Sequence, residues 1–449
     1  MSINQSVTPG FIDLATFDEL EKYLYGGPDA TTYFVALVKT STWFTLIPTI
    51  LTKNMGQADF GQEWAASISR AGDYLVHTWL RGNVPSVSVT QSLAGQGATI
   101  RWTHNFAHNL IREAAVTFND LVAARFDSYY LDFWAAFTVP ASKQVGYNNM
   151  IGNTPDQYVA SASLPAFTFN LPLPFFFARD TGVSLPTAAL PYNEMRIQIN
   201  TRDWTELLVI YGNGGSPPVP TLSGRAPQSG EVTVTGSSNS PHIGYMNVWA
   251  EYAIVSNDER KRMGCAPRDI LIEQVQTAPR VTFNIGAQSA ASTDIRFSHA
   301  VKALLFAVRN TTVKSDWSNY TVGNLASNGA SATPVDPVSN ASLLYENTQR
   351  LAGLPADYYS LVEPWYKAPT IPEATGYHMY SYSINMYDIN PMGSTNYGKL
   401  TNVTLDLASN NITLPTDSNK ISYSYESVIC AINHNVIRIS GGALGFPVL

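Results

Sequence analysis

Apolar and polar residues alternate with a period of two in several separate segments, and this pattern constrains the fold more than any other feature. Such alternation is typical of strands that bury one face. Long helical crossovers do not separate these segments, so the sequence predicts an antiparallel all-β fold. The first segment should lie at a sheet edge or end at a bulge, because its prolines Pro172 and Pro174 cannot donate to a ladder. The segments are residues 167–173, 246–254, 281–285, 378–386 and 403–407.

Three short helices are also expected, each from a capping residue at its start. The first is an acidic helix near the N-terminus, which Gly and Pro residues should end. The second and third each follow an Asp and contain Tyr and Leu, and the motif continues to Trp134 in the second and to Trp365, beyond the helix, in the third. The predicted caps and helices are Thr16 with Glu19 for a helix ending before residues 26–28, Asp127 for 128–137, and Asp357 for 358–362 with Pro364 ending it.

The chain separates into two parts of similar size. Residues 212–230 contain five Gly and four Pro, with Arg225 as the only charge, and this composition favours a linker or long exposed loop. A second loop is expected at 323–340, which is rich in Asn, Ser, Ala and Pro. The Asp-capped helix of each part carries a similar motif, so the two parts could be copies of one fold.

Charge argues against a nucleic-acid-binding role. The formal net charge is −7, Lys and Arg form no cluster, and the first 21 residues contain neither. Phosphate backbones are bound by clustered basic side chains. The two cysteines, Cys265 and Cys430, belong to no CxxC pattern, and no apolar leader opens the chain, so we expect both to stay reduced in a cytosolic setting. No window reaches the roughly 18 apolar residues of a membrane-spanning helix.

Sequence motifs that would indicate catalysis, nucleotide binding or metal binding are weak. Residues 393–399 match GxxxxGK, but Leu400 stands where a phosphate-binding loop needs Ser or Thr, so a loop between strands is expected. His104 and His108 could chelate zinc on a helix, whereas in the strand suggested by the neighbouring apolar residues they would be about 13 Å apart. We therefore predict structural histidines, no catalytic, cofactor-binding or metal residues, no cofactor, and no enzymatic activity.

Long blocks of the sequence resemble the iridovirus major capsid proteins, the double jelly-roll capsid proteins of nucleocytoplasmic large DNA viruses. They run from residue 10 to the C-terminus, and the departures fall mainly at 212–244 and 313–340. The blocks are residues 10–16, 25–27, 30–35, 60–62, 70–75, 100–103, 108–111, 118–120, 146–153, 171–177, 296–304, 358–366, 393–398, 431–435 and 445–447.

This resemblance implies two tandem eight-stranded antiparallel jelly rolls with a few short helices. The expected organisation is an N-terminal arm with a short helix at 1–27, a first jelly roll at 28–211, a Gly/Pro-rich linker or loop at 212–241, and a second jelly roll at 242–449. The long loops at 212–244 and 313–340 would project outward.

As a function, the resemblance implies a structural major capsid protein. It would form pseudo-hexameric homotrimers that tile an icosahedral shell over an internal lipid membrane, synthesised and assembled in the host cytoplasm. Its partners would be itself, minor capsid proteins and penton proteins, with the membrane nearby but not spanned and no direct nucleic acid. The arm, 1–27, would contact minor capsid or membrane-proximal proteins.

Two other functions compete with this reading. A β-sandwich carbohydrate-binding or glycan-hydrolysing protein could stack sugars on exposed Trp and Tyr, and specific glycan binding would reveal it. A nucleotide-dependent enzyme could use residues 393–399, and its ATP binding would be lost in Lys399→Ala.

Overall fold

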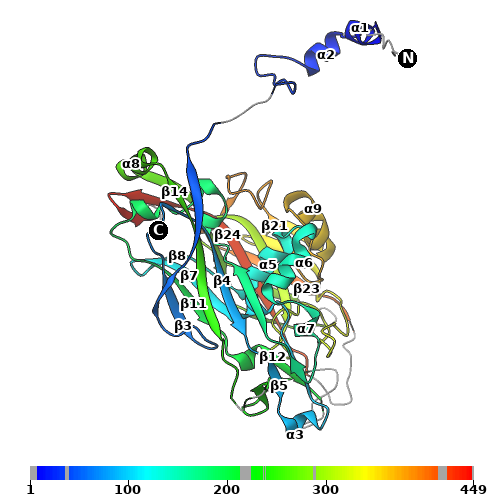
Figure 1. Cartoon of the computed structure of the whole chain (residues 1–449). Helices are drawn as coiled ribbons and strands as arrows, with labels where there is room; N and C mark the ends of the chain where they lie inside the picture. Colours follow the sequence, from blue (N-terminus) through cyan, green and yellow to red (C-terminus); the bar gives the residue numbers. More distant parts are fainter. Residues whose placement is uncertain are drawn as a thin grey trace, which may run out of the picture. The chain divides into compact units, whose positions relative to one another are not determined.

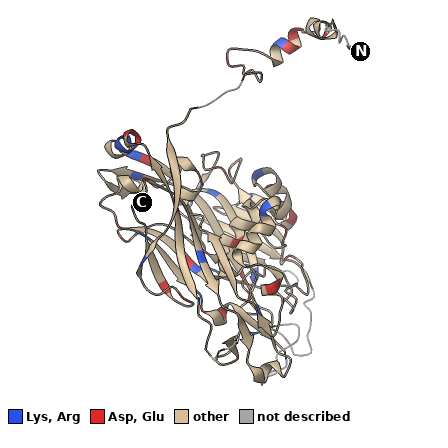
Figure 2. Ribbon diagram, viewed as in Figure 1, with Lys and Arg blue, Asp and Glu red and all other residues tan. Residues whose placement is uncertain are grey.

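The computed structural model describes residues 8–35, 40–212, 224–235, 237, 239–286, 290–412 and 422–446. The chain divides into an N-terminal unit, residues 1–43, and a larger unit, residues 44–449. Figure 1 shows that the larger unit consists mainly of strands, with the longer helices α5 and α6 side by side. Charged residues of both signs are scattered over the part of the chain drawn in Figure 2, without a band of one sign.

The N-terminal unit contains two helices, α1 (Thr8–Ala15) and α2 (Glu19–Leu24). The predicted acidic helix is confirmed, but its cap is Asp18 rather than Thr16. The Asp18 carboxylate accepts a bond from the Glu19 amide, and Glu21 completes the capping box. Thr16 was a wrong cap because its hydroxyl donates instead to the Asp13 carbonyl at the end of α1, a helix that the sequence analysis did not predict.

The larger unit contains two sandwiches with the same strand order. In each, eight strands counted along the chain form one sheet ordered 1-8-3-6 and another ordered 2-7-4-5, with antiparallel pairing throughout. This is the order of a jelly roll, so the predicted all-β fold of two tandem jelly rolls is confirmed. Its main strands in the first jelly roll are β1 (Phe44–Ile50), β3 (Glu63–Ser67), β4 (Tyr74–Val84), β7 (Ile111–Phe118), β8 (Leu121–Asp127), β10 (Phe167–Pro172), β11 (Met195–Thr201) and β14 (Tyr245–Val255).

The second jelly roll repeats this pattern. Its main strands are β15 (Arg268–Thr277), β17 (Ala290–Asp294), β18 (Ala300–Asn310), β19 (Val338–Tyr345), β20 (Thr348–Pro355), β21 (His378–Ser381), β23 (Val403–Ser409) and β24 (Tyr425–Ser440). Minor strands are β2 (Thr52–Met55), β5 (Val87–Val89), β6 (Thr99–Trp102), β9 (Ser163–Leu164), β12 (Leu208–Tyr211), β13 (Val232–Val234), β16 (Val281–Phe283), β22 (Thr395–Asn396) and β25 (Ala443–Gly445).

Short helices occupy the connections between strands. The α-helices are α3 (Gln91–Ala94), α4 (Phe106–Leu110), α5 (Ser128–Thr138), α6 (Ala141–Ile151), α7 (Pro155–Tyr158), α8 (Asn257–Cys265) and α9 (Glu363–Lys367). Single turns are η1 (Phe176–Ala178), η2 (Thr181–Val183), η3 (Thr187–Ala189), η4 (Trp204–Glu206), the π-helical η5 (Tyr358–Val362) and η6 (Tyr397–Lys399).

Of the two helices that were expected to begin with an Asp cap, only one does. Asp127 accepts a hydrogen bond from the Tyr130 amide and caps α5 as predicted. The cap expected from Asp357 is wrong, because its side chain makes no capping bond and residues 358–362 form a π-helical turn. Pro364 does not end the helix either. It lies near the start of α9, into which the π-helical turn η5 runs without a break.

The predicted strands have mixed outcomes. Strand β10 lies at a sheet edge, as its prolines indicated. The segment predicted over 378–386 forms strand only as far as Ser381. Beyond it, the Ser383 amide donates to the Ser381 hydroxyl, and the Ser383 hydroxyl donates to the Asn385 carbonyl. These local bonds compete with the ladder and end the strand.

The organisation of the chain differs from the expectation near residue 242. Strand β14, which the sequence analysis placed in the second jelly roll, pairs with β1 and β4 of the first. This pairing favours a boundary after Val255. The predicted linker at 212–241 lies partly outside the described residues, at 213–223, 236 and 238. Its described part is not simply a linker, because β13 pairs with β5.

The first jelly roll covers one face of the sheet formed by β15, β24, β18 and β21. Alternate residues of β18 and β24 pack in the core that continues into the first jelly roll, and their neighbours pack in the core of the second. Both strands are therefore buried on two faces and lack the alternating pattern of one-sided strands. The residues that face the first jelly roll are Ala303, Leu305, Ala307, Val428, Cys430 and Ile432.

Candidate functional site: the interface between the two jelly rolls

A long loop of the second jelly roll, residues 311–337, carries many of the polar contacts between the two jelly rolls. It connects β18 to β19 and contains a single isolated bridge, Leu325 with Ser331. The expectation that residues 313–340 project outward is wrong for this loop. The side chains of Asp316 and Tyr320 are 2% exposed and pair with groups of the first jelly roll, and Asn319, at 3%, is bonded within the loop itself.

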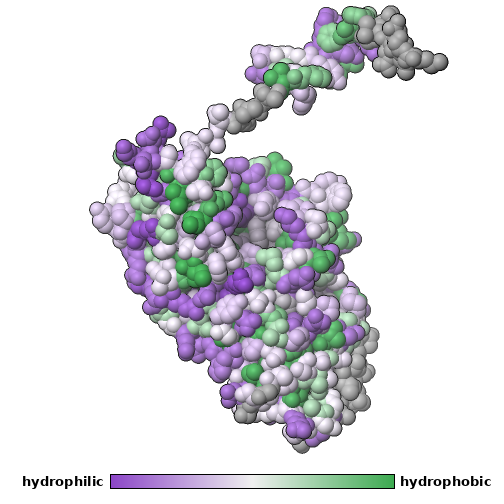
Figure 3. Space-filling model, in the orientation of Figure 1, coloured by the Kyte–Doolittle hydropathy of each residue, from purple (hydrophilic) through white to green (hydrophobic). Residues whose placement is uncertain are grey.

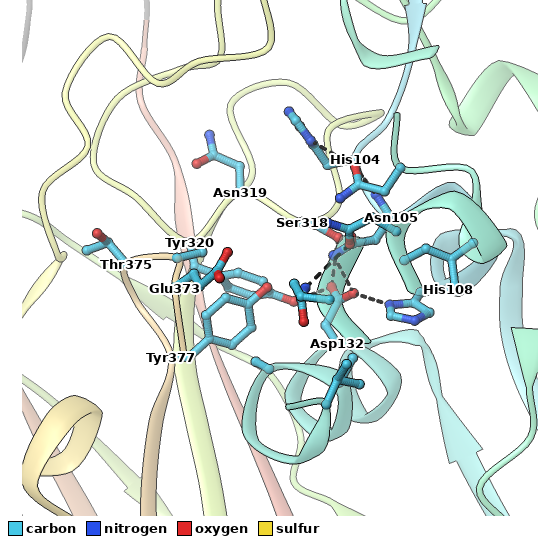
Figure 4. A pocket seen from close by; sticks show the side chains of 18 of the residues that line it. His104, Asn105, His108, Asp132, Ser318, Asn319, Tyr320, Glu373, Thr375 and Tyr377 are labelled. Carbon is cyan, nitrogen blue, oxygen red and sulfur yellow. Dashed lines mark hydrogen bonds and ion pairs between the residues drawn. The ribbon is translucent and has the colours of Figure 1, made fainter. Parts of the chain in front are cut away.

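Asp132 on α5 is the centre of one buried cluster (Figure 4). One carboxylate oxygen accepts from Asn105 at 3.0 Å and lies 2.7 Å from His108 Nδ1. The other accepts from the hydroxyls of Ser318, at 2.7 Å, and Tyr320, at 2.9 Å. Four partners compensate this carboxylate for its loss of water, and two of them come from the 311–337 loop. Burial raises the pKa of Tyr320 well above its usual value, so its phenol stays a donor.

These residues line a cavity of about 440 Å³ between α4, α5, α6, the 311–337 loop and residues 370–377. His104 lies at its rim, with its ring nitrogens 3.2 Å from the Asn153 side-chain oxygen and 2.8 Å from the Gly329 carbonyl. Burial, with the positive charge of Arg101, lowers the pKa of His104. The imidazole therefore joins the first jelly roll to the second as a neutral hydrogen-bonding group.

Arg101 on β6 forms a buried ion pair with Asp316 of the same loop. One guanidinium nitrogen lies 2.7 Å from each carboxylate oxygen, and the side chains are 0% and 2% exposed. The Nε group donates to the Tyr211 hydroxyl, which in turn donates to the Leu325 carbonyl. Because each charge is buried, removal of either partner leaves the other without compensation.

Trp317 next to this pair packs against two arginines from different jelly rolls. The guanidinium carbon of Arg202 lies 3.7 Å from its ring centroid and that of Arg309 lies 4.0 Å away. Its indole N–H donates to the Glu206 carbonyl at 2.8 Å. Burial lowers the pKa of Arg202 to about 10, so this guanidinium remains charged and suited to a cation–π contact at neutral pH.

Glu273 on β15 bridges two cations at a third position. It accepts from Lys302 on β18 at 2.6 Å and from Arg179 of the first jelly roll at 2.5 Å, and all three side chains are at most 6% exposed. Arg179 also lies 4.2 Å from the Trp134 ring centroid and donates to the Tyr387 carbonyl. Burial lowers the pKa of Lys302, while the Glu273 charge opposes that shift.

The structure places the histidines and the GxxxxGK segment in structural surroundings. His108 lies on the short helix α4 and His104 precedes it, so the strand expected through both residues is wrong. That strand ends at Trp102 because Asn105, in the left-handed region, starts the helix. Residues 393–399 form the connection between β21 and β23, as expected. Within the described ranges, no His, Cys, Asp and Glu side chains form a metal-binding group of three or more.

Sequence reasoning missed every charged residue of the interface. Arg101 and Asp316 are 215 positions apart and neither belongs to a motif. A faint signal was present in the 311–337 loop, where a Trp, a Tyr and an Asp stand in an otherwise small and polar stretch. None of the described helices combines the length and the hydrophobicity that crossing a membrane requires.

Comparison with known proteins follows the same division of the chain. Residues 32–255 match the family described as major capsid protein N-terminus, and residues 259–445 match the large eukaryotic DNA virus major capsid protein family. The major capsid protein of Costelytra zealandica iridescent virus is 55% identical, with both chains fully covered. That of Lymphocystis disease virus 1 is 44% identical over 99% of this chain and 98% of its own.

The chain belongs to the major capsid protein family of large eukaryotic DNA viruses. The capsid protein is thus a structural, non-enzymatic component of the virion. Solved structures share its fold at low sequence identity. PBCV-1 VP54, as fitted into a reconstruction of the virophage Sputnik, superimposes with a TM-score of 0.74 at 20% identity, covering 93% of this chain and 100% of its own. The Faustovirus major capsid protein gives 0.67 at 11% identity, covering 92% and 93%.

Proposed function

We propose that the capsid protein assembles as homotrimers that tile an icosahedral shell over an internal lipid membrane. The observation that carries this proposal is the fixed pairing of two jelly rolls with one strand order in one chain. Three such chains place six similar sandwiches around an axis, which gives a three-fold assembly a nearly hexagonal outline. A ring of this kind closes through heterologous contacts, in which different surfaces of each chain meet.

The buried interface suits this role because a tile must keep its shape. The ion pairs Arg101–Asp316 and Arg179–Glu273 fix the position of one jelly roll against the other at two places. The hydrogen bonds that Asp132 accepts from the 311–337 loop fix it at a third. Weak lateral contacts between rigid tiles add up over a closed shell, so no single contact has to be strong. Assembly would take place in the host cytoplasm, next to a membrane. The absence of direct nucleic-acid contact in this proposal agrees with the net charge of −7.

The N-terminal unit is the part of the chain that we assign to minor capsid, penton or membrane-proximal partners. Helices α1 and α2 form no core of their own, and their apolar side chains are largely exposed, as expected for a segment that binds elsewhere. The exposed residues are Phe11, Ile12, Leu14, Phe17, Leu20, Tyr23 and Leu24, at 53–92%.

Sedimentation and particle assembly test both proposals together. The full chain should sediment as a trimer of 3 × 49.1 ≈ 147 kDa and form closed shells when its virion partners are present. A chain without residues 1–15 should keep the trimer mass but fail to form shells. A persistent full-length monomer at micromolar concentration would contradict the trimer, and normal shells from the truncated chain would contradict the role of the arm.

A further inference from the structure

The internal repeat gives the two jelly rolls equivalent surfaces, but only one of the two equivalent sheet faces is covered. In the second jelly roll, the outer face of the 1-8-3-6 sheet lies beneath the first jelly roll. Strand β8 and helix α5, which follow each other in the chain, make this contact. Gln274 on β15 donates to the Ala123 carbonyl on β8, and Tyr129 on α5 donates to Glu426 on β24.

The covered face carries a row of paired residues across its four strands. Thr277, Cys430, Leu305 and Met379 stand opposite one another in register, on β15, β24, β18 and β21. Paired residues of neighbouring antiparallel strands share a face. Cys430, Leu305 and Met379 are each 0% exposed. The neighbouring Asp127 and Tyr130 of the first jelly roll are close enough to interact electrostatically with the Cys430 thiol.

The same sheet of the first jelly roll, β1-β14-β4-β10, has an open outer face, which we call the open sheet face. Figure 1 shows β14 and β4 side by side with β1 in front of them. The corresponding row is Ile50, Trp249, Trp79 and Pro172. The two indoles stack with centroids 5.9 Å apart. Ile50 is 48% exposed and Pro172 is also exposed, so this row is apolar without being buried.

The open sheet face has three further features that are uncommon on a surface without a binding partner. Figure 3 shows hydrophobic surface in the region of β1, where Phe44 and Leu46, on the same face of the strand as Ile50, are 54% and 47% exposed. Strand β1 is also the edge of its sheet. A hollow of about 520 Å³, bordered by Trp79, Pro172, Met150 and Trp134 among others, adjoins the row. An apolar row, an apolar edge strand and a hollow at one place indicate a contact surface.

The elements of the second jelly roll that correspond to β8 and α5 are exposed in the single chain. Strand β20 and the η5–α9 segment correspond to β8 and α5, because each pair follows the same strand order and ends in the repeated Tyr- and Trp-containing motif. Strand β20 is an edge strand paired only with β19, and six of its eight residues are exposed. On η5 and α9, Leu361, Val362, Trp365 and Tyr366 are 45–76% exposed.

We propose that β20 and the η5–α9 segment of one copy pack on the open sheet face of a second copy, repeating between chains the contact that joins the two jelly rolls within a chain. This inference rests on the proposed trimer and names the surfaces that close it. The contact is heterologous, because two different surfaces meet. A dimer therefore still has one unoccupied copy of each surface: β20 with the η5–α9 segment on one chain, and the open sheet face on the other. Those surfaces are used up when the ring closes. Trp365 and Tyr366 are the aromatic anchors of the contact, facing Trp79, Trp249 and Ile50.

Cross-linking between differently tagged chains tests this contact. In a Cys265→Ser background, one chain carries Ile50→Cys and the other Tyr366→Cys, and the two are co-expressed and treated with a short bifunctional maleimide. The expected product joins one chain of each kind, at 2 × 49.1 ≈ 98 kDa. Replacing Ile50→Cys by Asp120→Cys, an exposed thiol on the β7–β8 hairpin of the other sheet, should abolish the product.

Sedimentation separates this inference from the trimer proposal. The double variant Trp365→Ala, Tyr366→Ala should weaken trimer formation at least tenfold, and Tyr192→Ala, which removes a 77% exposed ring elsewhere, should not. A wild-type trimer that persists in the double variant, with no mixed cross-link, overturns the proposed contact and leaves the trimer standing. Cross-linking of Tyr366→Cys chains to one another with equal yield also overturns it, because it shows a symmetric contact. A monomeric wild type defeats the trimer proposal itself.

Discussion

Individual buried charges hold the two jelly rolls of the capsid protein together. A surface ion pair contributes little because water competes for both partners. The Arg101–Asp316 pair differs because both side chains are nearly inaccessible and each makes further bonds to neighbouring groups. Its role is to fix one geometry, because both oxygens of the buried Asp316 carboxylate are bonded to Arg101. Trp317 adds to this fixation through its contacts with Arg202 and Arg309.

Substitution of this pair should show the dependence of each charge on the other. Arg101→Met should lower the free energy of unfolding by about 3–5 kcal/mol, because it leaves the Asp316 charge buried and unpaired. Adding Asp316→Leu should recover part of that loss. Denaturant titration of the single and double variants measures both effects.

The control is Arg438→Met, which breaks an exposed pair with Asp269. That variant should unfold at nearly the wild-type denaturant concentration. If the Arg101 and Asp316 substitutions had simply additive effects, the charges would be independent and the account given for the interface would be wrong.

At the scale of elements, the repeat contains two matched helix starts, of which only one has a capping hydrogen bond. The Asp127 carboxylate accepts from the Tyr130 amide at 2.9 Å, whereas Asp357 makes no capping bond. Asp127 also accepts from the Thr277 hydroxyl across the interface at 3.3 Å. Asp127→Ala should therefore cost at least about 1 kcal/mol of stability, the usual value for a lost cap, because the Thr277 hydroxyl also loses its acceptor. Asp357→Ala should change the unfolding midpoint much less. Equal losses in denaturant titrations of the two variants would show that the capping bond contributes nothing beyond a general effect of removing Asp.

The sequence predicted the elements that bury one face and obey local rules. Strand β10 and the cap of α5 follow from alternation, proline and Asp chemistry. The two-sided strands β18 and β24 carry no such alternation, because the second face is buried by a sandwich whose position depends on the tertiary fold. Helix α4 interrupts an alternating stretch. Asn105, which starts it in the left-handed region, is a residue type that tolerates this conformation, but a single Asn is too unspecific to predict a helix start. Residues joined across hundreds of positions, such as those of the interface, leave no periodic pattern.

The larger unit as a whole behaves as one body because its two sandwiches share a core. Residues from β18 and β24 continue the apolar core of the first jelly roll, and the 311–337 loop adds buried polar pairs on the same side. Separating the jelly rolls would expose this apolar face and leave several charges without partners. The cost of separation thus includes both apolar exposure and unpaired charge, and a state with two intact but separated jelly rolls should not be populated.

Cys430 reports directly on that separation. Its thiol is 0% exposed on the face of β24 that meets the first jelly roll, and burial raises its pKa well above the usual value, so it should be unreactive in the folded protein. Cys265 is exposed and is removed as Cys265→Ser, which leaves Cys430 as the only thiol. With increasing denaturant, labelling of Cys430 by a maleimide should rise at the same midpoint as the loss of β-sheet circular dichroism. Labelling at a lower midpoint, with the sheet signal intact, would show that the jelly rolls part before they unfold and that the shared core does not make them one rigid tile.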